Sequence, residues 1–187
     1  MGVVLKTLPK PVRIAPLTAA CRPPQGSSSV NNEGISQGLG LIPSGVFVLA
    51  AAQDGESAAI LASFVQQSGF DPPSVVVAVG KDRQIRRVIE SSGRFALSVM
   101  SDDSKASLKK FWKGVPEGSD PFEGLATRKH LSGIPILEDA VGYVECDLRE
   151  LIELGDHCLC VGDVTGGGRI SEKSEPMVRI RKNGFEY

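Results

Sequence analysis

The sequence predicts a mainly β protein, an antiparallel β-barrel with helical insertions. Its apolar residues fall in runs of strand length, and Asp54-Gly55 between two of these runs is a strong signal for a two-residue hairpin turn. Only two segments have the apolar spacing of a substantial helix, so the chain lacks the alternating strand and helix pattern of a parallel nucleotide-binding sheet. The composition, with 41% hydrophobic residues, 21 glycines and 12 prolines, also suits a β-rich domain.

The expected strands are apolar runs bounded by Gly, Pro, Asn or Asp. Asp71-Pro72-Pro73 introduces one of them, because two successive prolines fix φ and remove two N–H donors. The run Gly166-Gly167-Gly168 is interpreted as a loop that joins two strands, and Gly38 and Gly40 as turn glycines. We place the strands at 46–52, 58–64, 75–79, 95–100, 141–148, 157–164 and 177–180.

Helices are expected in three places. A short one over 34–41 stops before a proline, and a second over 82–92 ends at Gly93 as a left-handed cap. Residues 113–136 follow the third helix as a long glycine- and proline-rich loop, which in a compact domain is usually functional. The third helix, capped by Ser101 or Asp102, carries Leu108, Phe111 and Trp112.

Residues 1–32 differ from the rest of the chain, since they hold basic residues and several prolines but no acidic residue. Such a segment cannot bury enough apolar surface to offset the entropy of ordering it. We therefore expect a flexible N-terminal extension over 1–32 and one domain over 33–187. The same composition also fits an organelle transit peptide. Localisation is cytoplasmic on the first interpretation and organellar on the second.

The formal net charge is only -1, so no overall field indicates a nucleic acid or an anionic membrane as partner. The apolar runs are much shorter than the roughly 20 residues that span a bilayer. We expect a soluble protein with no nucleic acid and no membrane partner.

The four cysteines, Cys21, Cys146, Cys158 and Cys160, are expected to be structural thiols in a reducing compartment. Three of them lie in or beside predicted strands, and no signal-peptide pattern precedes them. Cys158 and Cys160 stand beside His157, but no second Cys or His pair at ligand spacing completes a metal site. We therefore predict no metal centre.

The familiar catalytic motifs are absent: the chain has no nucleophile elbow, no P-loop and no dinucleotide-binding glycine fingerprint after a strand. The first candidate site is Leu61, Ala62, Ser63 and Phe64. Small residues and a hydroxyl let a planar ring approach main-chain N–H groups, which can stabilise negative charge on the ring. The alternative is an ordinary hairpin strand with Phe64 in the core.

Two further candidates carry charge. Lys81 and Arg83 lie between a strand and a helix, and a helix N-terminus backed by cations suits a phosphate. The alternative is a solvated first turn. His157 stands at the start of a strand, where it could deliver a proton or contact a ligand, or serve only as a structural residue.

Taken together, these segments resemble the flavin reductase family of FMN-binding split barrels, from about residue 34 to the C-terminus. They are closest to the C-terminal flavin reductase module of the flavodiiron proteins. The motifs that carry the resemblance are Pro43 to Val46, Ala62-Ser63-Phe64 with Asp71-Pro72-Pro73, Val79 to Arg83, Ser92 to Leu97, Asp120 to Gly124, Gly133 to Pro135, Glu145-Cys146 and Gly155-Asp156-His157.

The resemblance implies a split-barrel homodimer that binds FMN near the subunit interface and takes hydride from NAD(P)H. By position, Leu61, Ala62, Ser63 and Phe64 would line the flavin ring, and His157 would lie on the nicotinamide side. Lys81 and Arg83 would meet the phosphate, although the family often has small hydroxyl residues there.

The leading hypothesis is an NAD(P)H-dependent flavin oxidoreductase, with a separate polypeptide as a possible electron acceptor. The alternative is an FMN-binding electron carrier or interaction module without NAD(P)H turnover. The sequence does not choose between NADH and NADPH, nor between tightly bound and exchanged flavin.

Overall fold

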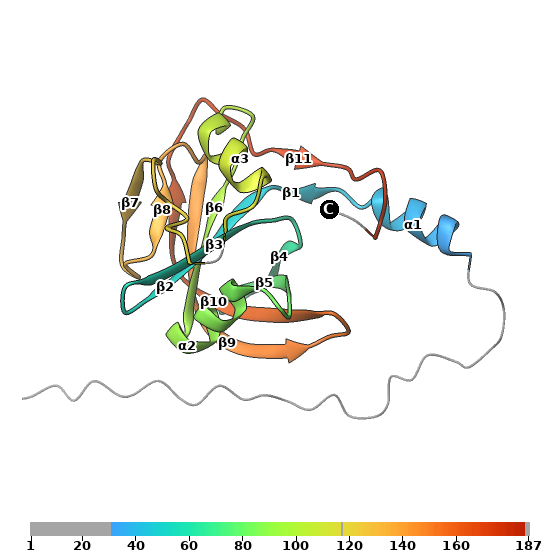
Figure 1. The fold of residues 1–187 in the computed structure, drawn as a ribbon, viewed down its shortest axis with the longest axis horizontal. Coiled ribbons are helices and arrows are strands. Elements are labelled where there is room, and N and C mark those ends of the chain that lie inside the picture. Colours follow the sequence, from blue (N-terminus) through green and yellow to red (C-terminus); the bar gives the residue numbers. More distant parts are fainter. Residues whose placement is uncertain (1–30, 117, 186–187) are drawn as a thin grey trace, which may run out of the picture.

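The computed structural model describes residues 31–116 and 118–185, so nearly all of the expected N-terminal extension lies outside the described residues. At its centre is a seven-stranded antiparallel sheet with the strand order β3-β2-β6-β9-β10-β5-β4 (Figure 1). The predicted fold class is confirmed. The strands are β2 (Phe47–Gln53), β3 (Glu56–Ala62), β4 (Val65–Phe70), β5 (Pro73–Gly80), β6 (Arg94–Val99), β9 (Gly142–Glu153) and β10 (His157–Arg169).

The sheet is curled because its two edge strands are neighbours in the chain. Only Ser63 and Phe64 separate the end of β3 from the start of β4. This link spans roughly 11 Å at full extension, whereas the edges of a flat seven-stranded sheet lie about 29 Å apart. The Phe64 carbonyl accepts a hydrogen bond from the Ala78 N–H at 3.0 Å, so the link is held against β5. The edges therefore meet at this corner.

Strand β2 is buried on both faces, as its unbroken apolar run requires. Leu49 and Ala51 point into the barrel, while Val48 and Ala50 point to a second apolar cluster outside it. The outer cluster is covered by α3 (Lys105–Trp112) and by a small hairpin of β7 (Thr127–Lys129) and β8 (Pro135–Leu137).

Helix α2 (Gln84–Ser92) packs against one end of the barrel through Ile85, Val88 and Ile89. It ends at Gly93, whose φ of 65° is the left-handed conformation predicted for this cap.

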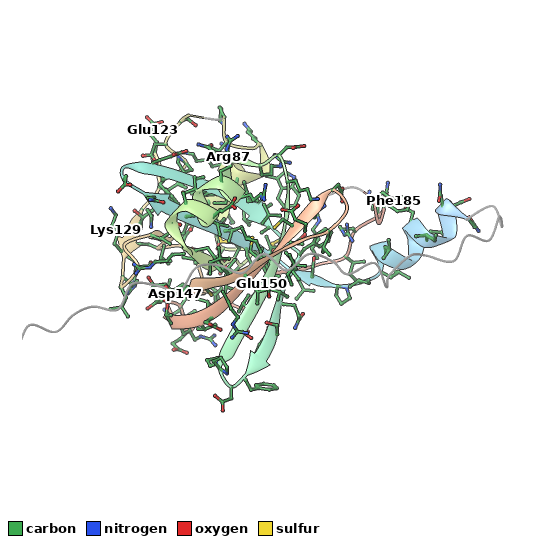
Figure 2. All side chains as sticks on the ribbon, turned by 90° about the horizontal axis from the view of Figure 1, so that it is seen from below. Arg87, Glu123, Lys129, Asp147, Glu150 and Phe185 are labelled. Carbon is green, nitrogen blue, oxygen red and sulfur yellow. The ribbon has the colours of Figure 1, made fainter. Side chains whose placement is uncertain are left out.

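The first and last described segments form an arm that projects from the barrel (Figure 1). We define the arm as residues 32–45, which include α1 (Asn32–Gly40) and β1 (Ser44–Gly45), and residues 178–185, which include β11 (Val178–Arg179). Figure 2 shows Phe185 on this arm, beside α1. Its two halves touch closely, since a Cβ at Gly184 would lie 2.4 Å from the Cβ of Leu39. Glycine is therefore required where the C-terminal segment crosses α1.

Several local predictions were wrong. β3 ends at Ala62 instead of Phe64, and β4 was not predicted because Gln66, Gln67 and Ser68 leave it without an apolar face. The predicted loop 113–136 contains the β7–β8 hairpin. Helix α3 begins after Ser104, although the Ser101 hydroxyl does accept a hydrogen bond from the Asp103 N–H at 3.2 Å.

The assignment of glycines to turns and loops was also wrong. Gly38 and Gly40 lie in α1, and the run 166–168 lies inside β10 and does not join two strands. A Cβ at Gly166 would lie 2.8 Å from the Glu145 carboxylate, and one at Gly167 would lie 2.9 Å from the Tyr143 carbonyl oxygen. These glycines allow β10 to approach β9 closely, which explains their place in a strand.

Cys146, Cys158 and Cys160 are free and buried, in agreement with the structural role predicted for them, while Cys21 lies outside the described residues. Burial raises the pKa of Cys146 and of Cys160 to about 12. The pKa of Cys158 is also raised, chiefly by burial.

We expect these three thiols to be unreactive in the folded protein. In a Cys21→Ser variant, a chromogenic disulfide reagent at pH 8 should titrate three thiols per chain after unfolding and almost none before. Because the buried thiols keep their protons above the unfolded value near 9, the free energy of unfolding should fall as the pH rises from about 9 toward 12. Rapid labelling of the native variant would contradict this assignment.

Candidate flavin site at the corner between β3 and β4

The four residues predicted to line a flavin ring lie at the corner where β3 passes into β4. Ala62 belongs to the core of the barrel, and Leu61 packs against the outer cluster on the other face. The Ser63 hydroxyl oxygen is buried and has no hydrogen-bond partner among the described residues. A buried hydroxyl without a partner is costly. A ligand atom that bonds to this hydroxyl would remove that cost.

The Phe64 ring lies near two nitrogen-bearing side chains from distant parts of the chain. Its ring centroid is 6.0 Å from that of His157, with the rings tilted by 57°. The guanidinium carbon of Arg181 lies 4.8 Å from the centroid of the same ring. The structure thus brings together Phe64 and His157, which the sequence proposed separately. Arg181 was missed, and the only sequence signal for it is the alternation of Arg179 and Arg181 with apolar residues near the C-terminus.

His157 is the first residue of β10 and pairs with Gly80, the last residue of β5. Its Nδ1 lies 2.9 Å from the Asp156 carboxylate, and its side chain is 22% exposed. The pKa of Asp156 is lowered, chiefly by this hydrogen bond from His157. The Asp156 carbonyl accepts a hydrogen bond from the Lys81 N–H at 3.1 Å. The imidazole is therefore held at a fixed place beside Phe64.

Lys81 is engaged within the protein. Its Nζ lies 2.8 Å from the carboxylate of Glu153, which also accepts a hydrogen bond from Arg86 at 2.8 Å. The pKa of Glu153 is lowered, chiefly by its hydrogen bond with Lys81. This arrangement ties the end of β5 and α2 to the end of β9. The positive charge of Lys81 is therefore paired with the Glu153 carboxylate before any ligand binds.

Arg83 lies elsewhere, at the N-terminus of α2. It lines a pocket of about 160 Å³ together with residues 57–60 of the edge strand β3 and residues of the 115–121 loop, whereas Lys81 does not line it. Arg83 is exposed, and the first N–H groups of α2 carry the positive end of the helix dipole. The structure thus separates the two cations that the sequence grouped.

These features suit a flavin that carries a phosphate. The corner at 61–64 offers a buried hydroxyl and an aromatic ring, and the pocket beside Arg83 offers a helix N-terminus to a phosphate. Among the described residues, no three His, Cys, Asp or Glu side chains gather where they could hold a metal ion. Within the same part of the chain, no helix has the length and apolar character needed to cross a membrane.

Residues 39–185 match the family model described as "Flavin reductase like domain". The chain belongs to the flavin reductase-like family. It is 34% identical over 154 residues to "Diflavin flavoprotein A 1" of Synechocystis sp. and 35% identical over 156 residues to "Putative diflavin flavoprotein A 3" of Nostoc sp.. Each match covers 82% of this chain but only 27% of the relative. The chain thus corresponds to the C-terminal module of these flavodiiron proteins, about a quarter of their length.

Solved structures agree on the fold. The NADH:FAD oxidoreductase SgcE6 of Streptomyces globisporus C-1027 superposes with a TM-score of 0.72 at 26% identity, covering 84% of this chain and 93% of that one. The same protein has been solved "in complex with NAD and FAD fragments". Flavin reductase PheA2 shares the fold, with a TM-score of 0.65 and 22% identity. The superposition covers 76% of this chain and 88% of PheA2. The predicted split-barrel architecture is confirmed.

The separation of Lys81 from Arg83 predicts unequal effects on FMN binding. Arg83→Ala should weaken FMN at least tenfold, because a charge-assisted contact to phosphate contributes on the order of 1.5 to 3 kcal/mol. Riboflavin, which lacks the phosphate, should be affected much less. Lys81→Ala is the matched control and should change FMN affinity by less than Arg83→Ala. Equal losses for FMN and riboflavin in Arg83→Ala, measured by fluorescence titration, would remove Arg83 from the phosphate site.

Proposed function

We propose that this protein is an NAD(P)H-dependent flavin oxidoreductase that binds FMN. The observation that carries the proposal is the corner at 63–64, where a buried hydroxyl without a protein partner adjoins an aromatic ring and an imidazole. Family membership supports it, as does the relative with 26% identity that is named an NADH:FAD oxidoreductase. A bound flavin would accept a hydride from the nicotinamide, and the chain's own residues would orient the two rings.

Each site residue has a defined task in this proposal. Residues 61–64 line the flavin ring and offer it main-chain N–H groups. Arg83 and the N-terminus of α2 hold the phosphate. His157 contacts the nicotinamide or moves a proton, and the Asp156 carboxylate at 2.9 Å keeps its ring in one orientation. The electron acceptor would be a separate polypeptide.

We also propose that the protein is a homodimer that pairs through the arm. Large apolar side chains 38% to 69% exposed follow one another along the arm, and such a concentration is unusual on a monomer. The arm also leaves the barrel, so its own domain does not cover these side chains (Figure 1). A second copy supplies a matching apolar surface through two-fold symmetry. The side chains are Ile35, Leu39, Leu41, Ile42, Val178, Ile180 and Phe185.

The function is tested by anaerobic reduction of the FMN-loaded protein. NADH or NADPH should bleach the flavin band near 450 nm, and His157→Ala should slow this step by roughly 100-fold, the scale of a lost positioned or proton-transfer group, with little change in flavin affinity. Stopped-flow absorbance at saturating nucleotide measures the rate. Asp156→Asn keeps the imidazole and alters only the carboxylate that orients it, so it should slow the step less than His157→Ala does.

Bleaching by dithionite alone would reject the reductase and leave an FMN-binding carrier. A His157→Ala protein that melts early yet reduces its flavin at the parent rate would give His157 a structural role only.

The dimer is tested by charging the arm. Leu41→Lys with Ile180→Lys should convert a dimer to a monomer in sedimentation velocity at micromolar concentration, because burying two unpaired ammonium groups is unfavourable. Leu131→Lys is the matched control, since Leu131 is 86% exposed on the barrel and outside the arm. A parent protein that sediments as a monomer, or a charged variant that stays dimeric, would reject the arm as the interface.

A further inference from the structure

The C-terminal segment is fastened to the barrel by two arginines that alternate along it. The guanidinium carbon of Arg179 lies 4.3 Å from the centroid of a Trp112 ring, and that of Arg181 lies 4.8 Å from the Phe64 ring centroid. Two contacts of the same kind thus hold one extended segment. Only one of them reaches the candidate flavin site.

Arg181 is fixed by main-chain atoms of the arm. Its N–H donates to the Gly40 carbonyl at 3.1 Å, and its Nη2 and Nη1 donate to the carbonyls of Leu39 at 3.4 Å and Gly184 at 3.3 Å. Leu39 and Gly40 form the last turn of α1, where the negative end of the helix dipole favours a cation. The guanidinium is therefore held in place over the ring without any ligand.

The imidazole of His157 is the second nitrogen-bearing group near this ring, with its centroid 6.0 Å from that of Phe64. Phe64 thus has a guanidinium on one side and an imidazole nearby. The Phe64 ring, next to the buried Ser63 hydroxyl, is thus oriented by Arg181 and has nitrogen donors from Arg181 and His157 nearby. A guanidinium over an aromatic face restricts the ring and keeps its positive charge at a fixed position.

We propose that Arg181 is a positioning residue of the flavin site, which holds Phe64 in place and sets the electrostatic potential felt by the flavin. The inference rests on the proposed function. Hydride transfer adds two electrons and one proton to the flavin and leaves NAD(P)⁺, so the flavin gains one negative charge. A fixed cation at the corner favours that state over the oxidised one. Arg181 should therefore make the bound flavin easier to reduce.

The test compares three variants of the full chain loaded with FMN. Arg181→Met should lower the affinity for reduced flavin relative to oxidised flavin about tenfold, which corresponds to a midpoint potential about 30 mV more negative for a two-electron couple. Arg181→Lys keeps the charge and should restore most of the potential. Arg179→Met removes the equivalent contact to Trp112 and should leave the potential unchanged, although it lowers the melting temperature as Arg181→Met does.

An unchanged potential in Arg181→Met, or an equal shift in Arg179→Met, would overturn the inference, since the second result assigns the effect to anchoring of the segment. A parent protein that binds no flavin would instead reject the proposed function. If Arg181→Met does not fold, Arg181→Gln is a second uncharged variant with hydrogen-bonding capacity. A Phe64→Leu background separates the two parts of the role, which are holding the ring and supplying the charge. In that background there is no aromatic ring to hold, so the Arg181→Lys exchange should no longer change FMN affinity.

Discussion

The two-residue link between β3 and β4 is the constraint on which the rest of the structure depends. The hydrogen-bond ladders place these strands at opposite edges of the sheet, while the chain allows them to be only two residues apart. Both conditions hold only if the sheet curls until its edges meet. The interior apolar residues then face one another, and α2 can cover one end with Ile85, Val88 and Ile89. Ser63 and Phe64 stand at the corner by the same necessity.

The corner is also where regular pairing stops, which explains why polar chemistry gathers there. Backbone groups at the ends of strands are not all used by a ladder, so a ligand can reach them. His157 lies at the corner because β10 begins opposite the last residue of β5. Lys81 lies there too, yet Glu153 at 2.8 Å already matches its charge. A partly exposed ion pair of this kind contributes little to folding. The ion pair instead joins the ends of β5 and β9.

The sequence could predict what local pattern determines. Asp54-Gly55 forms the expected hairpin with φ of 50° and 88°, and Gly93 caps α2 with φ of 65°. It could not predict β4, whose polar Gln66 and Gln67 are tolerated because an edge strand is held by hydrogen bonds to β5. The glycine run in β10 was also misassigned, because the need for it comes from Glu145 and Tyr143 on another strand. Spacing carries no information on such contacts.

The candidate site shows the same division. Residue types singled out Phe64 and His157 separately, but their contact depends on the register of β10 against β5. The separation of Lys81 from Arg83 depends on Glu153, more than 60 residues away in the chain. Arg181 is further still from Phe64, and nothing in its neighbourhood of the sequence indicates an aromatic partner. Contacts between distant segments therefore decide which of the plausible residues belong to the site.

In the C-terminal segment, charged side chains face inward and apolar side chains face outward, which connects the candidate site to the proposed dimer interface. Arg179 and Arg181 face the barrel, whereas Val178 and Ile180 are 67% and 61% exposed. A segment at the surface of a monomer normally has its apolar side chains inward and its charges outward. The inward arginines are satisfied by aromatic rings and by carbonyls of α1, so the protein can keep charge on that side. The outward apolar residues gain nothing until another surface covers them. In the proposed dimer, one short segment would therefore carry both the apolar contact with the second copy and the arginine beside Phe64.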